Sequence, residues 1–235
     1  RKVSEGLINS NYSLLSPRSH CPSCHNYLRL IDNIPIFSYL ILGGKCRNCA
    51  NPISLRYPIV ELISFIGTIY LISNFGIANE LGTETGSIIK VSMLCVFFWA
   101  CLALAFIDFY TKTLPDSITL KLLWVGILFS LSPFSNISLK SSVLGAAFGY
   151  FSLWIVYQAY RLLTGKAGMG YGDFKLLAAI CAWSGIESLA PLLLFSSASG
   201  AIFGTALILL NKLNREQPMA FGPYLIISGY FFVLV

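Results

Sequence analysis

Long stretches without Asp, Glu, Lys or Arg limit what this chain can fold into. Six of them are close to the roughly 20 residues that a helix needs to cross a bilayer, and a shorter apolar segment is a seventh candidate. Only 11% of the residues are charged and 56% are hydrophobic, which excludes a soluble domain and a disordered chain. We therefore predict an all-α, polytopic membrane helix bundle with about seven spans. The six uncharged stretches are 62–79, 91–107, 123–139, 141–160, 188–211 and 219–235, and the shorter segment is 174–185.

The basic residues predict the orientation of these spans. When the loops are counted alternately, fourteen of the sixteen Lys and Arg residues fall on one side, and only Lys90 and Lys140 fall on the other. Basic loops face the cytosol, so the N-terminal segment of this multi-pass protein is predicted to be cytosolic. The same charges explain the net charge of +6 through topology and contact with anionic membrane lipid. We predict no nucleic-acid partner.

The N-terminal part of the chain differs in composition from the rest. It is polar, rich in Ser, Asn and Pro, and holds four of the seven cysteines. We therefore predict two domains, a cytosolic Cys-rich domain at 1–56 and a transmembrane domain at 57–235.

The four N-terminal cysteines form two C-x-x-C pairs, Cys21 with Cys24 and Cys46 with Cys49. Two such pairs present four thiolates to one tetrahedral ion, which suits Zn²⁺ and leaves no open coordination position. We therefore predict a structural zinc site. Two disulfides are the alternative, which the reducing cytosol disfavours.

The remaining cysteines and the two histidines have simpler interpretations. His20 and His25 flank the first pair and could replace a cysteine ligand, although we interpret them as solvated neighbours. Cys95, Cys101 and Cys181 lie within predicted spans, where packing as small apolar side chains is expected.

Two carboxylates lie at the ends of predicted spans. Asp108 ends the second span and Asp173 begins the short fifth one, so both are expected at the cytosolic face. Carboxylates inside membrane segments are expensive and are usually functional. Two close carboxyl groups can share a proton, so that one activates a water while the other protonates a scissile carbonyl. We predict that these two acids form a catalytic dyad.

The residues around Asp173 have two possible roles. Gly170 and Gly172 would let the backbone approach an extended substrate. Asp173 could equally be a helix N-cap, with the glycines before it belonging to the loop that separates two helices. Lys175 could favour ionisation of Asp173, but two positions along a helix it faces elsewhere, and snorkelling to the lipid surface is the preferred interpretation.

Two other acids are weighed against Asp108. Asp116 follows Leu-Pro and precedes the third span, where an N-cap role explains it, yet it remains the rival for the first catalytic acid. Asp108 is preferred because it is deeper and a carboxylate at a helix C-terminal end opposes the helix dipole. Glu61 is placed in the first turn of the first span, where the dipole stabilises it.

Taken together, these motifs resemble the bacterial type IV prepilin peptidases, a family of GxGD aspartic peptidases. The similarity covers nearly the whole chain, and its elements occur in the family's order. They are the Ser-Pro-Arg-Ser-His-Cys-Pro-Ser-Cys run at 16–24, Asp-Asn-Ile-Pro at 32–35, the second cysteine pair, residues 51–61, the Asp-to-Leu-Pro-Asp element at 108–116, Gly-x-Gly-Asp-x-Lys-Leu at 170–176 and Phe-Gly-Pro at 221–223.

The resemblance implies an inner-membrane endopeptidase that removes the basic leader of type IV prepilins and of the pseudopilins of type II secretion. It implies that Asp108 and Asp173 are the catalytic acids, with Gly170, Gly172, Asp116 and Lys175 near the substrate. It also implies N-methylation of the new N-terminus with S-adenosylmethionine as donor, and the four-cysteine metal site. Since the family begins with a further hydrophobic helix and this chain opens at Arg1, we expect one more span before it.

Two other functions are considered. An intramembrane aspartyl protease of the presenilin type shares the Gly-x-Gly-Asp element, but its Pro-Ala-Leu signature does not occur near the C-terminus here. The second alternative is a non-enzymatic membrane transporter or assembly factor, in which the acids relay protons and the zinc domain docks a partner.

Overall fold

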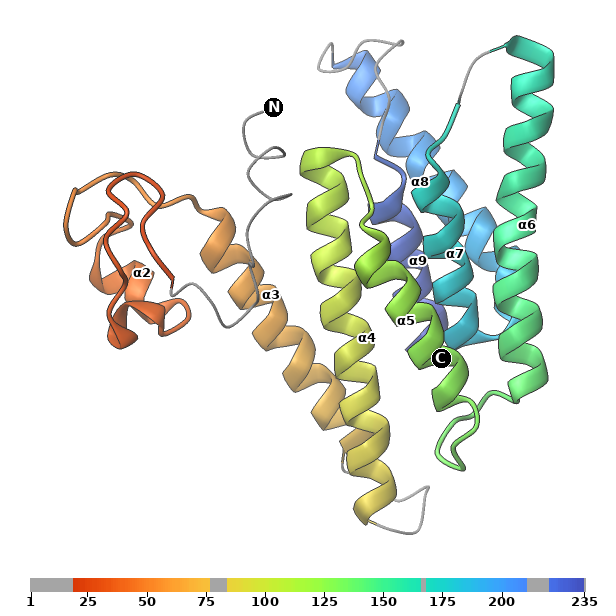
Figure 1. Cartoon of the computed structure of the whole chain (residues 1–235), viewed down its shortest axis with the longest axis horizontal. Helices are drawn as coiled ribbons and strands as arrows, with labels where there is room; N and C mark the ends of the chain where they lie inside the picture. Colours follow the sequence, from red (N-terminus) through yellow and green to blue (C-terminus); the bar gives the residue numbers. More distant parts are fainter. Residues whose placement is uncertain (1–18, 77–83, 166–167, 211–219, 235) are drawn as a thin grey trace. The chain divides into compact units, whose positions relative to one another are not determined.

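The computed structural model describes residues 19–76, 84–165, 168–210 and 220–234 (Figure 1). Within these ranges the chain forms helices and no strands, with two isolated β-bridges. The chain divides into two compact units, Arg1–Gly67 and Thr68–Val235.

The two C-x-x-C segments of the first unit have the same backbone geometry. In each segment the first cysteine N–H donates to the carbonyl five residues later, at Asn26 and Asn51, over 3.0 and 2.9 Å. The residue four positions after the first cysteine, His25 or Ala50, adopts a left-handed conformation with φ of +58° or +55°. These repeated turns bring the thiols of each pair to one side of a tight loop.

Two short helices connect these turns, and a long helix follows them. They are the 3-10 helix η1 (Leu30–Asn33), α2 (Phe37–Ile41) and α3 (Arg56–Leu71). The N–H of Ile36, just before α2, donates to Glu61 Oε2 on α3 over 2.8 Å. Glu61 therefore lies in the second turn of α3 rather than the first, and it anchors the preceding loop instead of only complementing the helix dipole.

The helices α3 to α9 correspond in order to the seven predicted spans among the described residues, which confirms the all-α membrane bundle. Four are long and apolar enough to cross a membrane: α3 with its π-helical extension η2 (Ile72–Gly76), α4, α6, and α8 with the short η4 before it. The bounds are α4 Glu84–Thr111, α5 Asp116–Phe129, α6 Leu139–Thr164, α7 Tyr171–Ser184, η4 Ile186–Ser188, α8 Leu189–Leu209 and α9 Gly222–Leu234.

Two predicted span boundaries were wrong. The third uncharged stretch, 123–139, is not one helix, because α5 begins earlier, at Asp116, and ends at Phe129. The residues that follow turn back through a Ser- and Pro-containing loop, which is uncharged without being helical. Asp108 does not end α4, since that helix continues to Thr111.

The short helix α7 is the centre of the second unit, with α5 and α6 on either side and α9 also in contact with it (Figure 1). Every residue from Leu176 to Trp183 is buried, as are Asp173 and Phe174, and only Lys175 between them is partly exposed. Two glycines allow α6 to approach closely: a Cβ at Gly145 would lie 2.7 Å from the Cys181 carbonyl, and one at Gly149 would lie 3.3 Å from α7 backbone. Helix α7 therefore packs almost entirely against protein.

Candidate functional site

Asp108 lies on the last turn of α4 and is buried, with 5% of its surface exposed. Its Oδ2 accepts a 3.0 Å hydrogen bond from the backbone N–H of Gly222, the first residue of α9. A Cβ on Gly222 would lie 2.6 Å from the same oxygen, so only glycine allows this approach. The N–H and the positive end of the α9 dipole are the compensation that a carboxylate at a helix C-terminal end requires.

Asp173 lies in the first turn of α7 and is also buried, with 8% exposed. It is not the N-cap, because Gly170 holds that position. Asp173 Oδ1 is buried and has no hydrogen-bond partner among the described residues. A buried carboxylate oxygen normally has a partner, so this atom is expected to receive one from outside the protein.

The structure brings these two acids together from different helices. Asp108 on α4 and Asp173 on α7 are both buried near helix ends in the second unit, where α9 contacts both α4 and α7. The resulting arrangement has one carboxylate held by a backbone donor and one with an unpaired oxygen.

Asp116 and Lys175 form an ion pair instead of acting separately. Lys175 Nζ lies 2.7 Å from both oxygens of Asp116, which links α7 to the first residue of α5. Pro115 holds the N-cap position of α5 and Asp116 is its first residue, so the predicted N-cap role of Asp116 was wrong. The ion pair gives Lys175 a protein partner that the sequence did not indicate.

The two glycines before Asp173 have different surroundings. A Cβ on Gly172 would lie 2.8 Å from the Leu114 Cβ, so this glycine permits close packing between the two acidic motifs. Beside Gly170, in contrast, no atom would lie closer than 3.8 Å to an added Cβ. Gly170 is thus the glycine that has space next to it.

The four cysteines of the first unit converge as predicted. All four Sγ atoms lie within 4.8 Å of one another, and those of Cys21 and Cys49 are 3.9 Å apart. Thiolates around one zinc ion at about 2.3 Å are about 3.8 Å apart, so these residues fit a tetrahedral metal site. All four are free thiols, which contradicts the disulfide alternative. Backbone N–H groups of Cys24 and Ser23 lower the pKa of Cys21 to about 6, which favours the thiolate.

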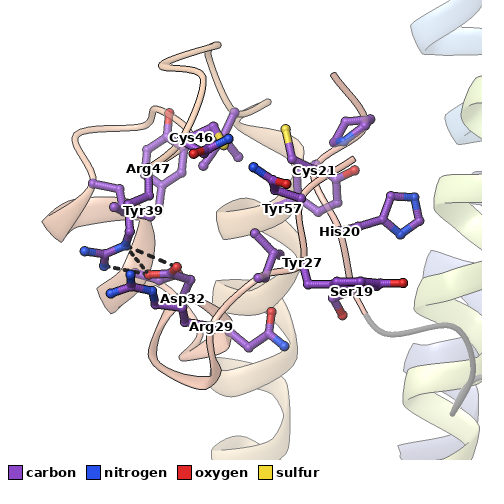
Figure 2. Close-up of a pocket in the computed structure, with 18 of the residues that line it drawn as sticks. Ser19, His20, Cys21, Tyr27, Arg29, Asp32, Tyr39, Cys46, Arg47 and Tyr57 are labelled. Carbon is purple, nitrogen blue, oxygen red and sulfur yellow. Dashed lines mark hydrogen bonds and ion pairs between the residues drawn. The ribbon is translucent and has the colours of Figure 1, made fainter. Parts of the chain in front are cut away.

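A pocket of about 870 Å³ lies beside this cluster in the same unit (Figure 2). Its lining includes three tyrosines and a bidentate ion pair in which Arg47 donates to both oxygens of Asp32, with a shortest distance of 2.7 Å. The Arg47 guanidinium holds the pKa of the Asp32 carboxyl below its usual range. The labelled lining residues are Ser19, His20, Cys21, Tyr27, Arg29, Asp32, Tyr39, Cys46, Arg47 and Tyr57.

The histidines lie next to the metal cluster without belonging to it. The rings of His20 and His25 stack with their centroids 5.8 Å apart, and His20 lines the pocket. Cys101 and Cys181 are buried in the apolar core, and Cys95 is buried in a second apolar cluster, as predicted.

Sequence reasoning missed the contribution of Gly222 to the site. In the sequence, the Phe-Gly-Pro element contributes only to the resemblance. The donor to Asp108 is a backbone N–H, and a backbone N–H is not indicated by the type of side chain. Its signal was a glycine at the start of an apolar helix, next to Pro223.

Comparisons with known proteins agree with this site. The model of the type IV leader peptidase family matches residues 95–205, and that of the bacterial peptidase A24 N-terminal domain matches residues 3–75. A prepilin leader peptidase/N-methyltransferase of Aeromonas hydrophila is 44% identical over 98% of this chain and 76% of its own length. Proteins with the same name from Dichelobacter nodosus and Pseudomonas aeruginosa are 44% and 41% identical, over 95% and 96% of this chain and 73% and 74% of their own lengths. No solved structure matches the chain. The chain is therefore an enzyme of the type IV leader peptidase family, as its acidic and cysteine motifs predicted.

Proposed function

We propose that this protein is an aspartic endopeptidase that removes the leader of type IV prepilins or pseudopilins, with Asp108 and Asp173 as its catalytic acids. The observation that carries the proposal is the pair of buried carboxyls from α4 and α7, one fixed by the Gly222 N–H and one with an unpaired oxygen. Family membership favours an enzyme over a transporter or assembly factor with the same acids.

The two carboxyls can divide the chemistry of hydrolysis. The Gly222 N–H occupies Asp108 Oδ2, so any proton on Asp108 sits on Oδ1. One carboxyl is ionised and takes a proton from a water molecule while the oxygen of that water attacks the scissile carbonyl carbon. The other carboxyl is protonated and donates its proton to the carbonyl oxygen. Collapse of the tetrahedral intermediate breaks the C–N bond. The carboxyl that took the proton from water passes it to the leaving amine, and the proton on the former carbonyl oxygen returns to the other carboxyl. Asp173 Oδ1 can accept from that water.

The scissile bond of a prepilin is expected at the same membrane interface as the two acids. A prepilin has a basic leader in the cytosol and an apolar helix in the bilayer, so its scissile bond lies at the interface. Both acids lie near helix ends, and the distribution of Lys and Arg supports a cytosolic location for those ends. Gly170, with open space beside it, is the position we assign to the substrate backbone.

We propose that the pocket of the first unit holds the methyl donor, S-adenosylmethionine. Its volume lies within the roughly 300–1,000 Å³ of small-molecule sites, and exposed faces of Tyr27 and Tyr57 are available to an adenine ring or a sulfonium cation. When bound, the donor supplies a methyl group, and the protein's contribution is to orient it.

The proposed function is tested by the mass of a prepilin after incubation with the purified protein and S-adenosylmethionine. We expect loss of the leader and gain of one methyl group. The Tyr27→Ala and Tyr57→Ala variants should still cleave but should lose most of the methylation, because each removes an aromatic face without touching the acids. A prepilin of unchanged mass with the wild-type protein would reject the peptidase assignment, whereas methylation retained by both variants would reject only the pocket.

Metal content gives an independent prediction. We expect about one zinc per chain in freshly reduced protein, and we expect its removal by a chelator to unfold the first unit, since a structural metal contributes its binding free energy to folding. Elemental analysis and thermal unfolding with and without chelator measure both. A matched variant, Cys95→Ser, lies outside the cluster and should keep the metal. Reduced protein without zinc would contradict the site.

A further inference from the structure

The segment between the two cysteine pairs exposes apolar side chains to an unusual degree. Leu30 is 89% exposed and Ile41 is 72% exposed, and other large apolar residues of η1, α2 and the turn between them are also exposed. We call this set the apolar patch. It comprises Leu30, Ile31, Ile34, Phe37, Leu40 and Ile41.

The residues of the apolar patch lie on the face of the two short helices that points away from the pocket. In α2, Phe37, Leu40 and Ile41 follow the i, i+3, i+4 spacing of one helix face, whereas Ser38 and Tyr39 line the pocket on the other. The helix η1 contacts α2 and likewise turns Asp32 inward to Arg47, as Figure 2 shows. Both short helices therefore direct their polar side chains into the domain and leave the apolar ones outside.

The patch is held at the beginning of a membrane helix. The Ile36 N–H, between Ile34 and Phe37 in the chain, is bound to Glu61 on α3, and α3 with its extension is one of the helices suited to cross a membrane. The uncharged stretch of this span begins at the next residue, Leu62, so Glu61 lies at the end of the apolar segment.

The charges on either side of the patch complement a lipid surface. Arg29 directly precedes η1 and Lys45 follows α2, and both are exposed. The one acidic residue between them, Asp32, is 5% exposed in its side chain and is neutralised by Arg47. An apolar face with basic ends and no free acid is typical of segments that lie in the interface of an anionic membrane.

We propose that the apolar patch inserts into the headgroup and upper acyl region of the bilayer, so that the cysteine domain is bound to the membrane surface by a second contact besides α3. Arg29 and Lys45 then meet anionic lipid headgroups, and the pocket side of α2 stays in water. The first unit is thus a membrane-associated domain with a fixed face toward lipid.

The test uses the full chain in nanodiscs of phosphatidylethanolamine and phosphatidylglycerol. An environment-sensitive fluorescent amino acid replaces Leu40 in one variant and the exposed Asn26 of the first cysteine turn in a matched control. We expect blue-shifted emission at position 40 and quenching by lipids that carry a shallow doxyl group, at least about twofold stronger than at position 26. Zinc content of both variants reports that the domain is folded.

Each other result overturns the proposal. Unshifted emission at position 40 means that the patch faces water. A blue shift without quenching by doxyl lipid means that protein covers the patch, and its dependence on the number of chains per disc distinguishes a second copy from another segment of the same chain. Equal quenching at both positions means that the domain has no fixed face toward the bilayer.

Discussion

Replacing either Asp108 or Asp173 by Asn should lower the rate of leader cleavage by about 10³-fold or more. The amide has nearly the same shape, so the buried site keeps its packing, but it cannot take a proton from water or deliver one to the carbonyl. In Asp108→Asn the substituted side chain can still accept from the Gly222 N–H. Single-turnover cleavage of a purified prepilin measures the rate, and methylation of a substrate that already lacks its leader should be unaffected.

The matched control for this pair is Asp116→Asn. Asp116 is 55% exposed in its side chain, and its amide can still accept from Lys175. An exposed ion pair contributes little to stability, so cleavage should stay within about threefold of the wild type. If Asp116→Asn were inactive while Asp108→Asn cleaved normally, the first catalytic acid would be Asp116.

The substitution Gly222→Ala should lower cleavage by about 10²-fold, because a displacement of about 1 Å at a reacting group has an effect of that size. The added Cβ would stand 2.6 Å from Asp108 Oδ2 and 3.1 Å from its Cγ, so the carboxyl or the start of α9 must move. The hydrogen bond that orients Asp108 is then lost or lengthened. The expected change is in the rate constant of single-turnover cleavage at saturating enzyme.

Gly229→Ala, on the same helix, separates this effect from damage to the fold. Its Cβ would meet the side chain of Ile180, a core residue on α7, at 2.5 Å, which is an equally close contact. Gly229 itself is about two turns along α9 from Gly222 and the acid. We expect a lower unfolding temperature for both variants and a large loss of rate only for Gly222→Ala. Parallel losses in both would mean that Gly222 matters for packing alone.

Features of side-chain chemistry could be predicted from the sequence. The four cysteines were identified by spacing, and the acids by the scarcity of charge in spans, because thiols and buried carboxylates have few other uses in such positions. The order of the helices followed from the uncharged stretches. The family followed from these motifs together.

Features that depend on tertiary contact could not be predicted. The Asp116–Lys175 pair joins residues 59 positions apart, and each residue had a local explanation that was sufficient on its own. The true end of α5 lies within an uncharged stretch, and the Ser- and Pro-containing turn that follows it carries no charge, so a count of charged residues does not locate it. The Gly222 donor is backbone, and the Ile36–Glu61 hydrogen bond again depends on a main-chain N–H.

The burial of α7 affects how the protein is assembled in the membrane. Its 14 residues span about 21 Å, less than the roughly 30 Å hydrocarbon core, and they include Asp173 and Lys175. Such a segment partitions poorly into lipid by itself, because charged side chains are unfavourable there. The helices that cover it, α5 and α6, precede it in the chain and so are synthesised first. Biogenesis of the site therefore depends on these earlier helices, which provide a protein surface for α7 in place of lipid.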